Sequence, residues 1–286
     1  VLTWMRQHNV PAYDELTGRG LVRHIMTRST TSGELMVVVV VTRADIPKAD
    51  RLVELLRAVV PGLCSVCLSV NSRRTNVILG TDIRVLWGKA AMEDTLCGLH
   101  FAVSPLSFFQ VNPKQTEKLY GLALDYAGLT GNETVVDAYC GAGTISLLLA
   151  QKAKKVIGIE IVPEAIQNAN ENAARNNIAN AEFRVGATEE LLPQLVADGL
   201  RPDVIVLDPP RKGCDPAVLQ AIIAAAPKRV VYVSCGAPTL ARDAKLLAEG
   251  GYAAEKVQCV DMFCWTGAVE TVMALSKLSD AEQYRH

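Results

Sequence analysis

The chain has 286 residues, of which 50% are hydrophobic and 21% are charged, and this composition excludes a disordered tail, a collagen-like fibre and a disulfide-rich mini-protein. Its 29 Lys and Arg residues nearly balance 30 Asp and Glu residues, so no overall basic bias points to a polyanionic partner, although a balanced total can hide a basic face. The longest aliphatic run, residues 35–41, is too short to span a membrane, and eight Cys residues in a chain of this length favour a reduced, cytoplasmic setting.

The N-terminal part, residues 1–104, combines short strands with one clear helix. The chain begins with Val1 and with an apolar pattern typical of the inside of a helix, so we expect it to be a piece of a longer protein. A helical period over residues 50–60 stops at Pro61. Continuous or β-branched apolar runs predict strands at residues 35–41, 64–70 and 76–79. We therefore expect a small α/β domain over residues 1–104.

From about residue 112 onward, strands alternate with helices. The pattern predicts helices at residues 113–127, 143–151, 163–176, 216–225 and 239–249. It predicts strands at residues 134–138, 155–160, 203–207, 229–234, 256–260 and 269–276. Nearly uninterrupted apolar strands between helices indicate a mostly parallel sheet covered on both faces, a Rossmann-like α/β domain over residues 105–286. Ligands of such sheets bind at the carboxyl ends of the strands, where the informative residues of this chain lie.

The first two strands of this domain end in a pattern typical of cofactor binding. The first runs into Asp137-Ala-Tyr-Cys-Gly-Ala-Gly-Thr144, whose glycines allow a sharp turn and a close approach to a ligand at a helix N-terminus. The second ends in Glu160, at a distance where a carboxylate can bind both hydroxyls of a ribose. The pair fits a dinucleotide and S-adenosylmethionine equally, but Tyr139 stands where a dinucleotide motif has its first glycine, which disfavours NAD.

Two later strands deliver reactive groups to the same edge. Asp208-Pro-Pro-Arg211 follows a buried strand, and its prolines make a rigid, extended exit that holds Asp208 and Arg211 toward the ligand. Cys235 ends the next strand just before a helix, where peptide dipoles stabilise a thiolate. Glu270 lies near the start of the last strand, between Val269 and Thr271, and is either an exposed strand-edge residue or a general base near Cys235.

A metal site is not expected. Cys64 and Cys67 have the spacing of half a metal site, but only Cys97 and His100 lie near them in the sequence, and no second Cys-x-x-Cys pair occurs. A small buried thiol is the simpler interpretation for both.

Together these motifs resemble the bacterial RNA uracil-5-methyltransferases, and within them the 23S ribosomal RNA branch more than the transfer-RNA branch. The segments that carry the resemblance are Ser107-Phe-Phe-Gln-Val-Asn112, Asp137-Ala-Tyr-Cys-Gly-Ala-Gly-Thr-Ile-Ser146, Asp208-Pro-Pro-Arg-Lys-Gly213, Val233-Ser-Cys235 with Thr239-Leu-Ala-Arg-Asp243, and Asp261-Met-Phe263 with Val269-Glu270. The Gly-Thr pair at 143–144 and the Asp-Met-Phe at 261–263 are similar to the ribosomal branch. Residues 1–104 resemble the family's central, RNA-contacting domain.

The resemblance implies S-adenosylmethionine as cofactor, RNA as substrate, no membrane partner and a monomer. It implies cofactor contacts from Gln110, Tyr139, Thr144, Glu160 and Asp208. It also implies that Cys235 is the nucleophile, that Glu270 is the base that removes the C5 proton, and that Arg211 holds Asp208 or the target uracil. We also expect this chain to lack the family's N-terminal OB-like domain and the Cys cluster of its iron–sulfur site.

Some residues depart from the family pattern. Gly236-Ala-Pro238 replaces Asn-Pro-Ala after the cysteine, and Cys264 and Ala268 replace a Pro and a His, with Trp265 also unusual. Three alternatives stay open: a transfer-RNA uracil-5 enzyme, an RNA cytosine-5 enzyme, and a non-catalytic RNA-binding protein on the same fold. Cytosine-5 enzymes tend to have a Cys after Asp-Pro-Pro, where this chain has Arg211.

Overall fold

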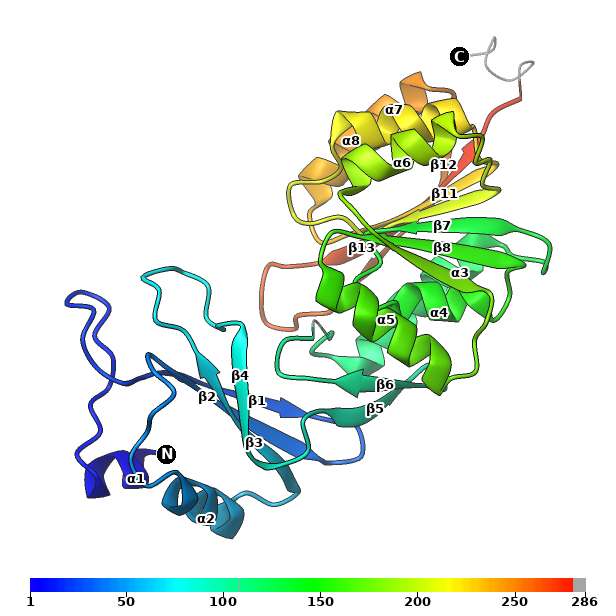
Figure 1. Cartoon of the computed structure of the whole chain (residues 1–286). Helices are drawn as coiled ribbons and strands as arrows, with labels where there is room; N and C mark the ends of the chain where they lie inside the picture. Colours follow the sequence, from blue (N-terminus) through cyan, green and yellow to red (C-terminus); the bar gives the residue numbers. More distant parts are fainter. Residues whose placement is uncertain (108, 280–286) are drawn as a thin grey trace. The chain divides into compact units, whose positions relative to one another are not determined.

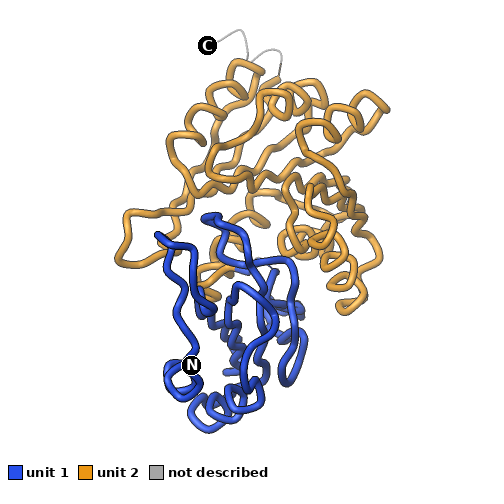
Figure 2. Tube along the Cα trace, turned by 60° about the vertical axis from the view of Figure 1, so that its left-hand side comes forward, with its two compact units in different colours: residues 1–109 blue, residues 110–286 orange. Residues whose placement is uncertain are grey.

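The computed structural model describes residues 1–107 and 109–279, which divide into two compact units, Val1–Phe109 and Gln110–His286 (Figure 2). This division comes five residues after the predicted boundary between residues 104 and 105. Phe108 of the Ser-Phe-Phe-Gln-Val-Asn motif and residues 280–286 of the predicted catalytic domain lie outside the described residues.

The first unit is built on a four-stranded sheet in the order β1-β2-β3-β4, whose strands are β1 (Val22–Ser29), β2 (Leu35–Val41), β3 (Leu63–Val70) and β4 (Asp82–Gly88). Helix α2 (Ala49–Val59) connects the parallel strands β2 and β3, and the short helix α1 (Leu2–Gln7) precedes the sheet. A separate hairpin joins β5 (Met92–Leu96) and β6 (Leu99–Val103). The fully apolar strand β2 is buried on both faces, which explains its unbroken run of valines.

One strand predicted in this unit is wrong. Residues 76–79 form no strand, and the fourth strand begins at Asp82 instead. The side-chain amide of Asn71 donates hydrogen bonds to the carbonyl oxygens of Val77 (2.7 Å) and Ile78 (3.1 Å). Because a side chain occupies these backbone acceptors, the segment is held as a loop beside the end of β3 rather than paired in a ladder.

The second unit contains a seven-stranded sheet in the order β12-β13-β11-β10-β7-β8-β9 (Figure 1). Its strands are β7 (Thr134–Ala138), β8 (Lys155–Glu160), β9 (Ala181–Val185), β10 (Val204–Leu207), β11 (Arg229–Ser234), β12 (Tyr252–Val260) and β13 (Glu270–Lys277). Strands β7 to β11 pair in parallel, and β13 lies antiparallel between β11 and β12. The strand order reverses between β7 and β10, the position where doubly wound sheets open a ligand crevice.

Helices cover both faces of this sheet, which confirms the predicted Rossmann-like fold. Figure 1 shows one layer formed by α6 (Thr188–Ala197), α7 (Pro216–Ala225) and α8 (Ala237–Glu249). The opposite layer contains α3 (Pro113–Ala127), α4 (Thr144–Ala150) and α5 (Pro163–Arg175). No helix among residues 1–107 and 109–279 is long and apolar enough to cross a membrane.

The sequence missed β9 and α6. The strand β9 is short and lies at the sheet edge with half-buried residues, so it lacks the apolar run that marks the central strands. The helix α6 contains Pro193, which usually ends a helix, but here it falls in the interior of the helix.

Candidate active site

The sheet register brings the predicted reactive residues to one edge. Strands β10 and β11 are parallel neighbours, so Asp208 and Cys235 both follow carboxyl ends. Strand β13 runs the opposite way beside β11, with Ser234 paired to Thr271. The next residues along, Cys235 and Glu270, therefore face each other across the ends of the two strands. Three residues from separate motifs thus meet because of strand order and register.

Glu160 is fixed by backbone amides at the end of β8. Its Oε2 accepts from the amide of Gly141 at 3.1 Å, and its Oε1 accepts from the amide of Val162 at 3.0 Å. These bonds orient the carboxylate and tie it to the turn between β7 and α4. Each oxygen has a second lone pair that can accept from a ligand hydroxyl.

The turn itself needs backbone conformations that favour glycine. Gly143 has φ +81°, and a Cβ at this position would lie 3.0 Å from Ala169 Cβ and 3.1 Å from Phe183 Cζ. Tyr139 adopts φ +74° without being glycine, and its amide donates to the carbonyl of Ile159 at 3.0 Å. The chain therefore holds a strained residue where it crosses from β7 to the helix.

Asp137 lies beneath this turn and is fully buried. Ser146 Oγ donates to Asp137 Oδ2, whereas Asp137 Oδ1 is buried with no hydrogen-bond partner within the described part of the chain. Burial raises the pKa of Asp137 to about 6, against the lowering effect of the Ser146 hydrogen bonds. An unpartnered carboxylate oxygen at a strand end is the kind of group that a bound ligand satisfies.

A residue that the sequence did not single out lies near both Gln110 and Thr144. The hydroxyl of Tyr120, buried on α3, is close enough to both side chains for each of them to oppose the rise of its pKa. Burial and the charge of Asp208 raise the pKa of the Tyr120 hydroxyl, so it stays a neutral donor. In the sequence, Tyr120 has only the signature of an apolar helix face, so its polar role was not detectable.

The reactive end collects two carboxyl groups, a thiol and a guanidinium. Burial, Glu270 and Asp137 together raise the pKa of Asp208 to about 8. Burial raises the pKa of Glu270, and the positive charge of Arg211 opposes the rise. Glu270 is only 5% exposed, so the alternative of an exposed strand-edge residue is wrong.

The expected stabilisation of a Cys235 thiolate is not the dominant effect. Burial, Glu270 and Asp208 raise the pKa of the half-buried thiol, while Arg211 and a backbone hydrogen bond act against them. Helix α8 does start beside it, at Ala237, two residues before the predicted start. Because burial disfavours the thiolate and two carboxyl groups lie nearer than sequence spacing revealed, the pKa of the thiol is raised rather than lowered.

A buried carboxylate clamps the loop that carries Arg211 onto α8. Asp243 Oδ2 accepts from the Tyr232 hydroxyl at 2.6 Å and from the Cys214 amide at 2.8 Å. Its Oδ1 forms an ion pair with Arg242 at 2.7 Å. Arg242 Nη2 also donates to the carbonyl oxygen of Lys212 at 3.0 Å. The Arg211 loop and the helix that begins beside Cys235 are thereby joined into one rigid piece.

A model of the family described as tRNA (Uracil-5-)-methyltransferase matches residues 24–278, which is most of the chain. The chain belongs to this family. An uncharacterized RNA methyltransferase of Listeria innocua is 51% identical over 274 residues, which cover 95% of this chain and 60% of the relative. One of Clostridium acetobutylicum is 48% identical over 276 residues, with 96% and 60% covered. The chain thus spans about 60% of the length of these relatives.

A solved structure of the same kind matches both units of the chain. The tRNA (uracil-54, C5)-methyltransferase of Pyrococcus abyssi, in complex with S-adenosyl-L-homocysteine, has a TM-score of 0.80 and 29% sequence identity. The match covers 95% of this chain and 64% of that protein. It confirms the predicted methyltransferase fold.

Cys64 and Cys67, whose spacing is that of half a metal site, lie in the first unit of the chain. Cys67 is buried, and Cys64 packs beside it against an apolar cluster that includes Met36 and Val38. Burial raises the pKa of both thiols. Within residues 1–107 and 109–279, no group of three or more His, Cys, Asp or Glu side chains is arranged to hold a metal ion.

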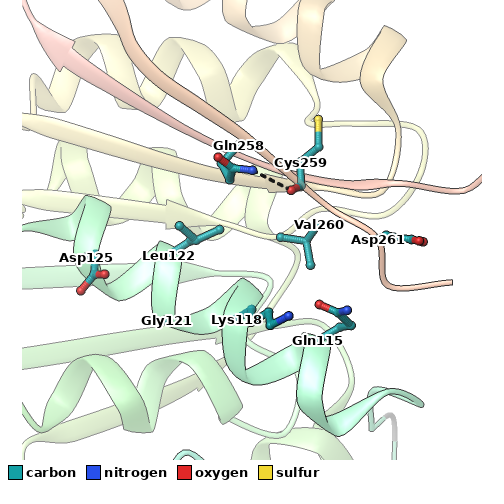
Figure 3. A pocket seen from close by; sticks show the side chains of 9 residues that line it. All are labelled: Gln115, Lys118, Gly121, Leu122, Asp125, Gln258, Cys259, Val260 and Asp261. Atoms are coloured by element: carbon teal, nitrogen blue, oxygen red, sulfur yellow. Dashed lines mark hydrogen bonds between the residues drawn. The ribbon is translucent and has the colours of Figure 1, made fainter. Parts of the chain in front are cut away.

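One cavity of this family member has a volume of about 480 Å³ (Figure 3), and Val260 in its lining pairs with Glu270 of β13. It is lined by α3 and by the end of the edge strand β12, through Gln115, Lys118, Gly121, Leu122, Asp125, Gln258, Cys259, Val260 and Asp261. No predicted site residue lines this cavity, so the site is defined by the strand ends and not by this cavity.

Proposed function

We propose that this chain carries the catalytic part of a cytoplasmic enzyme that methylates C5 of uracil in RNA, using S-adenosylmethionine and a covalent adduct with Cys235. The observation that carries the proposal is the buried Glu270 facing Cys235, with Arg211 acting on both and Asp208 acting on the thiol. C5 methylation of uracil needs a nucleophile and a base, and a thiol and a poised carboxyl group supply them.

The cofactor end fits S-adenosylmethionine. The oriented carboxylate of Glu160 suits the ribose hydroxyls, and the left-handed turn at Gly141 has nothing within 4 Å of an added Cβ. Gln110, Tyr139, Thr144 and Asp208 are the further side chains that would hold the molecule. When bound, S-adenosylmethionine supplies a methyl group on a positively charged sulfur. The homocysteine product bound to the Pyrococcus protein supports this choice.

The chain's own groups then account for the electron flow. The Cys235 thiol loses its proton to solvent, and its sulfur adds to C6 of uracil, which pushes electrons toward C5 and O4. Arg211 stabilises both the thiolate and this enolate by its positive charge. C5 of this adduct would then accept the methyl group, and the donor sulfur would lose its positive charge.

Proton removal completes the cycle. Glu270 takes the C5 proton, the C5–C6 double bond forms again, and the C6–S bond breaks to return the Cys235 thiolate. The raised pKa of Glu270 suits a carboxylate that must accept a carbon-bound proton. Asp208, with a pKa near 8, is a neutral donor at lower pH and can hydrogen-bond to a polar atom of substrate or cofactor.

Two classes of RNA are candidates for the substrate. The segments Gly143-Thr144 and Asp261-Met-Phe263 favour 23S ribosomal RNA. The Pyrococcus protein is named for uracil-54 of tRNA, which favours transfer RNA. Unmodified transcripts of both, incubated with the chain and methyl-labelled S-adenosylmethionine and digested to nucleosides, decide between them. We expect labelled 5-methyluridine from the ribosomal transcript. If the label is found in 5-methylcytidine, or if neither RNA gives a labelled nucleoside, the proposal is contradicted.

A further inference from the structure

Trp265 is the most exposed large apolar side chain among residues 110–279, the described part of the second unit. Its side chain is fully exposed, at 104% of the reference area, and its backbone has φ +68°. Exposing an indole forgoes the free energy of burying it, and a left-handed φ adds strain for a residue with a Cβ. Neither feature helps this chain to fold. By contrast, Trp4 is fully buried and Trp87 is half-buried under the guanidinium of Arg57.

The loop that carries Trp265 is held in shape by other residues. Met262 is buried, and its carbonyl oxygen accepts from Asn112 Nδ2 at 3.2 Å. The amide and the hydroxyl of Thr266 both donate to the carbonyl oxygen of Phe263, at 3.2 and 2.7 Å. The amide of Ala268 donates to Thr266 Oγ1 at 3.2 Å. The indole is therefore presented by a formed loop and is not used in its packing.

This loop leads directly into the reactive edge. It joins β12 to β13 and projects from the sheet, in orange-red, in Figure 1. Trp265 precedes Glu270 by five positions, so the two Cα atoms are at most about 18 Å apart. Glu270 faces Cys235, and the exposed Arg211 acts on both. A nucleotide strand that places one base at Cys235 passes within reach of the indole.

The surroundings of Trp265 identify its ligand. Its exposed neighbours Cys264, Thr266 and Gly267 are small or polar. Phe263 of the same loop is half-buried and Val269 is 42% exposed, so the indole is the one fully exposed large apolar side chain of this loop. Unpaired bases bind to such rings by stacking, and a base that flanks a flipped nucleotide needs a new stacking partner. We propose that Trp265 stacks on an unpaired base next to the target uracil and helps to hold the opened RNA strand; this rests on the proposed function.

Steady-state kinetics of methyl transfer to the accepting transcript test the proposal. We expect Trp265→Ala to raise the KM for RNA about tenfold or more, to leave the KM for S-adenosylmethionine unchanged, and Trp265→Phe to stay within about threefold of the parent chain. Val257→Ala, which shortens an apolar side chain 55% exposed on β12, is the matched control and should change neither constant. An unchanged KM for RNA in Trp265→Ala overturns the proposal.

Fluorescence distinguishes failure of this inference from failure of the proposed function. The difference between the parent chain and Trp265→Phe isolates the emission of Trp265. Titration with either transcript should quench this emission and protect it from acrylamide, even if no methyl transfer is detected. If methyl transfer proceeds but the indole stays accessible to acrylamide, stacking is refuted while the proposed function stands.

Discussion

The acidic side chains at the edge of the seven-stranded sheet where the parallel strands end have two different kinds of surroundings. At the β8 end, each carboxylate oxygen of Glu160 accepts a backbone amide from the surrounding turns. At the β10, β11 and β13 ends, Asp208 and Glu270 lie near each other with raised pKa values because burial penalises their charged forms. The first arrangement is suited to binding, since it orients acceptors. The second is suited to moving protons, since it places carboxyl groups where either protonation state is accessible.

Removing the nucleophile has the largest expected effect. Without a thiol no C6 adduct forms, so Cys235→Ala should give neither 5-methyluridine nor a covalent complex with RNA that contains 5-fluorouridine. A denaturing gel with methyl-labelled S-adenosylmethionine measures both. Cys259→Ala removes an exposed thiol on β12 and should behave like the parent chain. If the Cys235→Ala variant still methylated uracil C5, the covalent mechanism would be refuted.

Removing the base should stop the reaction at a later step. Glu270→Gln can still form the adduct and accept the methyl group, but the C5 proton stays in place. We therefore expect a labelled protein–RNA species to accumulate on the same gel, with little free product. Turnover of Glu270→Gln close to the parent rate would assign proton removal to another group.

At the binding end, the expected loss is in cofactor affinity. Glu160→Ala removes a carboxylate whose oxygens also hold the Gly141 and Val162 amides. We expect S-adenosylmethionine to bind about 1–3 kcal/mol more weakly, the range for a lost hydrogen bond to a charged group. Isothermal calorimetry measures this, and Glu171→Ala on the exposed face of α5 is the control. Equal affinities for the two variants would remove Glu160 from the site.

The pH dependence of alkylation of the Cys235 thiol should shift when Arg211 is replaced. Arg211 lowers the pKa of the thiol against burial and two carboxyl groups, so Arg211→Gln should raise it further. At a pH below the thiol pKa, less thiolate is then present and alkylation slows, about tenfold per pKa unit. Iodoacetamide labelling of the Cys235 peptide against pH, read by mass spectrometry, gives both curves. A shift to lower pH in Arg211→Gln would reverse the assigned role.

Loosening the clamp should have the smallest effect. Arg242→Met keeps the stem of the side chain but loses the ion pair to Asp243 and the bond to the Lys212 carbonyl. We expect a severalfold lower kcat and an alkylation curve shifted in the same direction as in Arg211→Gln. Combining the two substitutions should add little, because both act through the position of Arg211. Fully additive shifts would mean that Arg242 acts only on stability.

Much of the second unit was predictable because its signals are local. The strands Thr134–Ala138, Lys155–Glu160 and Arg229–Ser234 have the predicted bounds, since each is an apolar run that ends at a polar or glycine-containing turn. The first unit was less predictable, and residues 76–79 show why. Their apolar pattern suits a strand, but Asn71 occupies their carbonyl groups, and no sequence pattern reveals that competition.

The sequence by itself determined which residue types stand at each strand end, and therefore the family and the groups available for chemistry. Tertiary structure alone decided how those groups affect one another. Strand register puts Glu270 opposite Cys235, and burial beside Asp208 raises the thiol pKa where the helix start predicted a lower one. Tyr120 lies near both Gln110 and Thr144, and Asp243 locks the Arg211 loop to α8. The physical reason is that pKa values and hydrogen bonds depend on distance and solvent exclusion, which arise only when separate segments pack together.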